Sequence, residues 1–202
     1  LFACECSRSK IINSSASKIY PGTCRNKNIN YLKENQTWRV IVPENTFVFY
    51  STLANKKKKI DLTTGVGDFV IRRKEGLPAY QIASLMDDIE MSVNLIVRGA
   101  DLISSTGSQL FLAKCLNDSF FPTTQFVHHM LMKNESGKKL SKSSGDHSLK
   151  FLRNKYSSPT IVYQQSAEIL NLPFKDIQTL EDLKELFSKQ MTQRENFFTF
   201  ED

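Results

Sequence analysis

Three cysteines within the first 24 residues have the type and spacing that suit a metal ion. Cys4 and Cys6 flank a single residue, and Cys24 comes four positions after Tyr20. Thiolates bind Zn(II) tetrahedrally, so three of them need a fourth donor, and Tyr20 is the nearest candidate. A phenol has a pKa near 10, and only a bound cation would make its ionisation favourable at neutral pH. The spacing alone leaves zinc binding and three unrelated buried cysteines as equal alternatives.

A lysine-rich segment, KKLSKS at residues 138–143, is the second group that could do chemistry. Glycines at 137 and 145 flank it, so the backbone can form an open loop. Lys139 and Lys142, with serine hydroxyls beside them, could bind a polyphosphate and neutralise charge that develops on a leaving pyrophosphate. Composition alone favours the alternative, a solvated basic loop.

The segment between these two groups alternates between strand and helix patterns. The runs WRVIV and TFVFY predict two strands joined by a turn at residues 43–45, and the four lysines at 56–59 predict a solvated loop. Apolar residues spaced by three and four positions predict a helix over residues 79–90. NLIVRG predicts a buried parallel strand whose carboxyl end opens onto a ligand crevice.

Further along the chain, SSTGSQLFLAKCL predicts a helix on which Cys115 is a small buried hydrophobe. TQFVHHMLM predicts a strand that leads into the lysine-rich segment. After Leu149 the pattern is helical, with apolar positions at helical spacing and Thr179 as a helix cap.

Composition limits the class of protein and its partners. A chain of 202 residues with a net charge of +6 and a pI near 9.1 favours an anionic partner such as a nucleotide or tRNA. No apolar run approaches the ~20 residues that cross a bilayer, and the opening LFACECSRSK is unlike a signal peptide. We therefore expect a soluble cytoplasmic protein with reduced thiols and no membrane partner.

The order of residues in two regions resembles a known family. KLSKS resembles the Lys-Met-Ser-Lys-Ser loop of class I aminoacyl-tRNA synthetases, and residues 67–143 resemble the second half of a glutamyl-tRNA synthetase catalytic domain. The shared features are the GDFV strand, the Tyr80 segment, Asp87-Asp88, the VRG motif and the following Ser-Thr. The opening Cys-x-Cys and Tyr-x-x-x-Cys resemble the glutamyl-queuosine tRNA(Asp) synthetase branch, in which three cysteines and a tyrosine hold zinc.

This resemblance implies a fold and a domain order. The fold is α/β, the second half of a Rossmann-like class I catalytic domain. Residues 1–37 would be a zinc-binding subdomain, residues 38–150 the carboxy-terminal half of the catalytic domain with the KLSKS loop, and residues 151–202 a helical tail.

The resemblance also implies roles for single residues. Tyr80 and Arg98 match glutamate-binding positions, and Cys4, Cys6, Tyr20 and Cys24 match the zinc ligands. The loop residues Lys139, Leu140, Ser141, Lys142 and Ser143 would bind ATP, and the two lysines would assist catalysis. His128 matches a family histidine ahead of the loop, and because a histidine on a strand is usually structural, we assign it no catalytic role.

The implied reaction has two steps. Glutamate attacks ATP, with Mg(II) present, to give glutamyl adenylate, and the glutamyl group then passes to the queuosine base of tRNA(Asp). The implied partners are L-glutamate, ATP and tRNA(Asp), and the implied state is a monomer. A fragment of an ordinary glutamyl-tRNA synthetase and a non-catalytic, zinc-stabilised RNA-binding remnant are the alternatives.

Several features depart from the family pattern. The His-Ile-Gly-His-like motif is absent and the first residue is Leu, so we expect that the chain begins inside a domain and is inactive alone. Gly107 stands where relatives often have proline, and Met130 replaces another proline. These two changes affect the rigidity of the local backbone.

Overall fold

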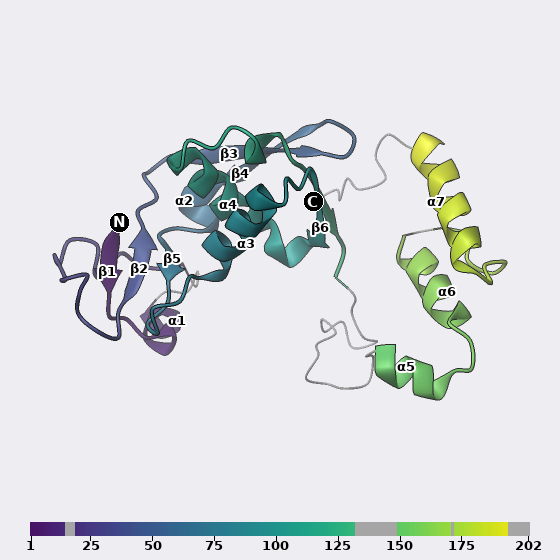
Figure 1. The fold of residues 1–202 in the computed structure, drawn as a ribbon, viewed down its shortest axis with the longest axis horizontal. Helices are drawn as coiled ribbons and strands as arrows, with labels where there is room; N and C mark the ends of the chain where they lie inside the picture. Colours follow the sequence, from purple (N-terminus) through teal and green to yellow (C-terminus); the bar gives the residue numbers. More distant parts are fainter. Residues whose placement is uncertain (15–18, 132–148, 171, 194–202) are drawn as a thin grey trace. The chain divides into compact units, whose positions relative to one another are not determined.

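The computed structural model describes residues 1–14, 19–131, 149–170 and 172–193 (Figure 1). The chain divides into two compact units, Leu1–His128 and His129–Asp202. Within the described residues, no helix is both long and apolar enough to cross a membrane.

The cysteine-bearing segment is part of an antiparallel sheet. Its strands, in spatial order, are β1 (Phe2–Cys4), β2 (Thr37–Val40) and β5 (Phe69–Arg72). Cys4 pairs with Thr37, and Trp38 pairs with Arg72. The short helix α1 (Arg8–Ser14) follows β1. Cys4, the first of the cysteines, is therefore the last residue of a strand that is hydrogen-bonded to β2.

A second sheet contains the remaining strands of the first unit. Its spatial order is β4 (Lys57–Asp61), β3 (Phe47–Thr52), β7 (Gln125–His129) and β6 (Leu95–Gly99). β3 pairs antiparallel with β4 and parallel with β7. The strands predicted in WRVIV and TFVFY are confirmed as β2 and β3, but they belong to different sheets.

The prediction of a loop at residues 56–59 was wrong. Lys57, Lys58 and Lys59 belong to β4 and pair with β3, which places them at an edge of the sheet. An edge strand satisfies half of its backbone groups by pairing while its lysine side chains remain in water. A charge run therefore does not exclude a strand at this position.

Helices of the first unit pack on one face of the second sheet (Figure 1). They are α2 (Leu62–Gly65), α3 (Tyr80–Glu90), the 3-10 turn Ala100–Leu102, α4 (Ile103–Cys115) and the 3-10 turn Phe121–Thr123. The core joins side chains of α3 and α4, among them Leu85 and Leu110, to Tyr50 and Phe126 of the sheet. Cys115, predicted to be buried, is exposed because it ends α4 beyond the packed face.

β6 is only half buried, although the sequence predicted a fully buried strand. Ile96 and Arg98 face the core, whereas Leu95 is 41% and Val97 61% exposed. β6 ends the order of its sheet, so it pairs on one side only. On β3, Phe47 and Phe49 are exposed as well. Within the described residues of the first unit, no layer covers these apolar side chains, whereas parallel sheets are normally covered on both faces.

Gly107 allows α4 to approach β4 closely. An added Cβ would lie 2.8 Å from Leu62 Cδ2 and 3.0 Å from Ile60 Cγ2. We predict that Gly107→Ala destabilises the chain by about 1 kcal/mol, because overpacking outweighs the helix propensity gained. Urea unfolding followed by circular dichroism measures this. Gly65→Ala is the matched control, since its Cβ would meet nothing within 4 Å, and equal stability losses in both variants would refute the steric argument.

The second unit is helical where it is described. It contains α5 (Leu149–Lys155), α6 (Thr160–Ile169) and α7 (Leu180–Gln193). A small core of Ala167, Leu172 and Ile177 joins α6 to α7. Thr179, the predicted cap, accepts a hydrogen bond from Asp182 N through Oγ1, while Asp182 Oδ2 accepts one from Thr179 N.

Candidate metal centre and amino-acid site

Three buried thiols and one buried phenol converge at the end of β1. The Sγ atoms of Cys4, Cys6 and Cys24 all lie within 4.8 Å of one another, and Cys6 Sγ is 3.6 Å from Cys24 Sγ. Tyr20 Oη lies 3.4 Å from Cys4 Sγ and 4.0 Å from Cys6 Sγ. The tertiary structure thus brings all four predicted metal ligands together.

The spacing of these atoms fits a tetrahedral ion. Zinc–sulfur bonds of about 2.3 Å at tetrahedral angles separate two sulfurs by roughly 3.8 Å and a sulfur from an oxygen by roughly 3.5 Å. The separations of 3.4 Å between Tyr20 Oη and Cys4 Sγ and of 3.6 Å between Cys6 Sγ and Cys24 Sγ are close to these values, and all three sulfurs lie within 4.8 Å of one another, so the residues present suit a Cys₃Tyr set. The Cys24 backbone N–H also donates to Tyr20 Oη at 2.7 Å and holds the phenol in position.

The electrostatics of the cluster favour one thiolate. Burial opposes the charged form of Cys4, but hydrogen bonding to Tyr20 and to the Cys6 backbone, together with Arg39, lowers the pKa of Cys4 to about 7. Burial, followed by contact with neighbouring cysteines, raises the pKa of Cys6 and of Tyr20. Cys6 and Tyr20 would therefore lose their protons only in the field of a cation.

Arg39 stabilises negative charge in this cluster. Its Cζ lies 3.9 Å from the centroid of the Tyr20 ring, and its Nη1 donates to Asp68 O. A guanidinium over the ring favours the phenolate that a metal ligand requires. Sequence spacing missed Arg39, because it lies on β2, in the strand next to the cysteines in space but not along the chain.

Arg98 and Tyr80 lie close together in the first unit. Arg98 comes from the end of β6 and is 8% exposed, whereas Tyr80 begins α3 and is 51% exposed. Burial lowers the pKa of Arg98, and the nearby Tyr80 and Asp88 oppose that shift by favouring the charged guanidinium. The pair that the sequence suggested therefore shares one electrostatic environment.

Two guanidinium nitrogens of Arg98 are buried without a hydrogen bond of standard geometry. Nη1 donates to Gln109 Oε1 at 2.8 Å, and the Phe126 ring centroid lies 5.2 Å from Cζ. Nε and Nη2 are buried and make no hydrogen bond of standard geometry within the described part of the chain, and Tyr80 lies near enough to favour the charged guanidinium. Because an unsatisfied buried donor costs about 1–3 kcal/mol, this arrangement suits an anionic ligand that supplies acceptors.

Sequence reasoning missed Gln109 and Asp88 as members of this site. Gln109 Oε1 accepts the bond from Arg98 Nη1 and orients the guanidinium, and Gln109 is itself fully buried. Burial raises the pKa of Asp88, while Arg98 and Ser84 oppose the shift. The sequence did contain a signal for Asp88. Residues 80, 84 and 88 are spaced by four positions, which places Ser84 and Asp88 on the same face of the predicted helix as Tyr80.

His128 has structural surroundings. Its Nε2 lies 2.8 Å from Thr106 Oγ1, and its ring stacks on Phe126 and meets Tyr50 edge to face. These contacts agree with the structural role assigned from the sequence. The predicted ATP-binding residues Lys139, Leu140, Ser141, Lys142 and Ser143 lie outside the described residues.

Comparison with known proteins identifies the family of the chain. Residues 9–196 match the family model for tRNA synthetases class I (E and Q), catalytic domain. A glutamyl-Q tRNA(Asp) synthetase from Janthinobacterium sp. is 37% identical over 155 residues, which cover 72% of this chain and 52% of that protein. One from Burkholderia mallei is 35% identical over 154 residues, covering 72% of this chain and 50% of that protein. The chain thus spans about half the length of these curated relatives.

Solved structures share the fold. The crystal structure of glutamate-tRNA synthetase from Elizabethkingia anophelis aligns with a TM-score of 0.53 at 21% identity, covering 72% of this chain and 33% of that one. This likeness supports the architecture of the sheets and helices. From the family model and the close relatives together, the chain belongs to the class I tRNA synthetase (E and Q) catalytic-domain family.

Proposed function

We propose that this chain supplies the glutamate-binding half of an enzyme that activates glutamate with ATP and transfers it to the queuosine base of tRNA(Asp). The observation that carries the proposal is the buried Arg98, whose Nε and Nη2 make no hydrogen bond of standard geometry within the described residues. A carboxylate accepts two parallel hydrogen bonds from a guanidinium, which satisfies both groups at once. Tyr80 beside Arg98 adds a hydroxyl and a wall to the same site.

The chemistry requires positioning and charge stabilisation. A carboxylate oxygen of glutamate attacks the α-phosphorus of ATP, the bond to the pyrophosphate breaks, and glutamyl adenylate forms. A hydroxyl of queuosine then attacks the activated carbonyl, AMP leaves, and the hydroxyl proton is lost to solvent. Arg98 and Tyr80 hold the glutamate, and no protein nucleophile is needed.

Lys139 and Lys142, with Leu140, Ser141 and Ser143, are the residues that we assign to ATP. Two ammonium groups three positions apart would bind the phosphates and stabilise the pyrophosphate as it leaves. Bound Mg(II) would neutralise further phosphate charge. This assignment rests on the KLSKS sequence in a member of the family.

We assign a structural zinc ion to Cys4, Cys6, Tyr20 and Cys24. Its support is the convergence of four buried donors at separations that suit tetrahedral coordination. Such an ion would join the first 24 residues to the sheet and supply cohesion that their polar composition lacks. It would have no part in the reaction.

The relatives favour tRNA(Asp) over tRNA(Glu) as the acceptor. The matched curated proteins are named for tRNA(Asp), and the charge of +6 suits a polyanionic partner. Because ATP and tRNA are cytoplasmic substrates, we propose that the enzyme acts in the cytoplasm, as a monomer. An ordinary glutamyl-tRNA synthetase would use the same glutamate site, so the acceptor RNA must be tested directly.

We also propose that these 202 residues do not catalyse the reaction alone. The support is the edge position of β6 and the exposure of Leu95 and Val97, which no described layer of the first unit covers. A site formed between two halves of a sheet draws binding energy from both. The missing contacts would leave ATP weakly held.

The test uses a reconstituted enzyme, defined as this chain joined to the part of the Janthinobacterium relative that it does not span. We predict glutamate-dependent exchange of pyrophosphate into ATP for the reconstituted enzyme, and exchange at least about 100-fold slower for the 202 residues alone. Labelled glutamate should then pass to queuosine-containing tRNA(Asp) and not to tRNA(Glu). Label on tRNA(Glu) would favour an ordinary glutamyl-tRNA synthetase, and no exchange would favour the non-catalytic remnant.

A further inference from the structure

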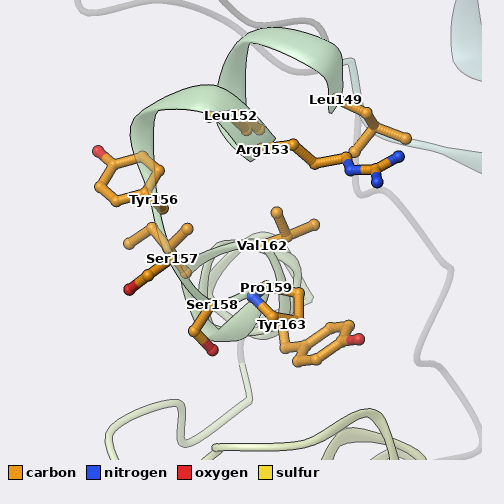
Figure 2. Close-up of a pocket in the computed structure, with 10 residues that line it drawn as sticks. Leu149, Leu152, Arg153, Tyr156, Ser157, Ser158, Pro159, Val162 and Tyr163 are labelled. Atoms are coloured by element: carbon orange, nitrogen blue, oxygen red, sulfur yellow. The ribbon is translucent and has the colours of Figure 1, made fainter.

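The second unit contains a pocket that the proposed reaction does not use. It lies between α5 and α6 and has a volume of about 420 Å³ (Figure 2). That volume falls in the range of small-molecule sites. The lining residues are Leu149, Leu152, Arg153, Tyr156, Ser157, Ser158, Pro159, Ile161, Val162 and Tyr163.

The pocket combines an apolar interior with a polar rim. Leu152 and Val162 give it aliphatic walls, and Tyr156 and Tyr163 lie on opposite sides of it in Figure 2. Tyr156 is 38% exposed, so its ring is accessible to a ligand. Aliphatic walls with exposed aromatic rings suit a flat, partly apolar ligand, and the rim hydroxyls can bond to its polar edge.

The segment that lines the pocket carries charges of one sign. Residues 149–163 include three cations, Lys150, Arg153 and Lys155, and no aspartate or glutamate, and Glu168 is the next charged residue along the chain. Lys155 Nζ lies 5.3 Å from the Tyr156 ring centroid and 5.8 Å from that of Phe151. Proteins that bind single-stranded nucleic acid combine cations, which contact the phosphates, with aromatic rings, on which the bases stack.

We propose that this pocket binds an unpaired nucleobase of the RNA substrate. The base would stack on Tyr156, and Arg153 and Lys150 would contact the flanking phosphates. A buried apolar peptide would match the aliphatic walls but would leave three cations without anionic partners, so the charge favours RNA. The inference rests on the proposed function, because it names where that enzyme would hold its RNA.

The experiment measures binding of the 202-residue chain to a fluorescein-labelled single-stranded RNA decamer by anisotropy. We expect Tyr156→Ala to weaken binding by roughly 10-fold, because stacking on one aromatic ring is lost, and Tyr156→Phe to bind nearly as the parent chain does. Arg153→Gln should weaken binding and flatten its salt dependence, whereas Lys175→Gln, which removes the same charge outside the pocket, should change binding far less.

Three results would overturn the proposal. One is equal affinity for single-stranded and fully duplex RNA, since a paired base cannot enter the pocket. Another is an unchanged affinity of Tyr156→Ala when its circular dichroism matches that of the parent chain. The third is a concentration-dependent dimer that Tyr156→Ala abolishes, which would assign the pocket to a second copy. Pyrophosphate exchange by the reconstituted enzyme needs no RNA, so its failure would reject the proposed function separately.

Discussion

Arg98→Ala in the reconstituted enzyme is expected to lower kcat/KM for glutamate in pyrophosphate exchange by about 100- to 1,000-fold. Within the described residues, Arg98 lies beside Tyr80, and its Nε and Nη2 atoms are buried without a hydrogen bond of standard geometry. Removing one partner of a buried, hydrogen-bonded charge pair costs about 2–5 kcal/mol, and a 100- to 1,000-fold loss, about 3–4 kcal/mol, lies inside that range. Steady-state exchange at varied glutamate measures the effect.

Two further variants make this prediction specific. Arg98→Lys keeps the charge but cannot form two parallel hydrogen bonds, so it should recover only a small part of the activity. Arg73→Ala removes an exposed arginine that pairs with Glu75 on the surface, and it should retain nearly full activity. If Arg98→Ala kept the parent kcat/KM for glutamate, the assignment of this site would be wrong.

Cys24→Ser is expected to remove most of the zinc from the chain and to unfold the segment that the ion holds. Serine keeps the size of cysteine but replaces a thiolate with a hydroxyl that zinc binds poorly. Structural zinc contributes about 10–16 kcal/mol of apparent binding free energy in small zinc-binding peptides, so loss of a ligand has a large effect. Metal analysis after dialysis should give about one zinc per parent chain and a small fraction of that for Cys24→Ser.

The fourth cysteine provides the matched control. Cys115 is exposed and lies at the end of α4, outside the thiol cluster, so Cys115→Ser should keep the parent zinc content and thermal stability. Tyr20→Phe separates the role of the phenol from that of the thiols, and it should bind zinc more weakly than the parent chain. Equal zinc content in Cys24→Ser and Cys115→Ser would contradict the proposed ligand set.

The sequence identified the family and several helices and strands, because motifs and periodicity depend only on residues that are close together along the chain. The family expected from KLSKS and residues 67–143 is confirmed by the match over residues 9–196. The helix predicted over 79–90 is confirmed as α3, and the predicted strands are confirmed as β2, β3, β5, β6 and β7. Periodicity is a local property, so a single chain reveals it.

The burial of single elements could not be predicted in the same way. Lys57 to Lys59 formed an edge strand and β6 remained half open, because burial depends on which strands lie at the edge of the sheet. The exposure of Cys115 has a related cause, because tertiary packing decides which end of α4 is covered. Composition carries no information on strand order.

The sequence by itself determined the kinds of groups at the two sites: three thiols and a phenol in the first, an arginine and a tyrosine in the second. Only the tertiary structure decided that Arg39 lies over the Tyr20 ring, that Gln109 orients Arg98, and that two buried nitrogens of Arg98 make no hydrogen bond of standard geometry. These contacts join residues from different helices and strands, so they follow from tertiary packing and not from spacing along the sequence.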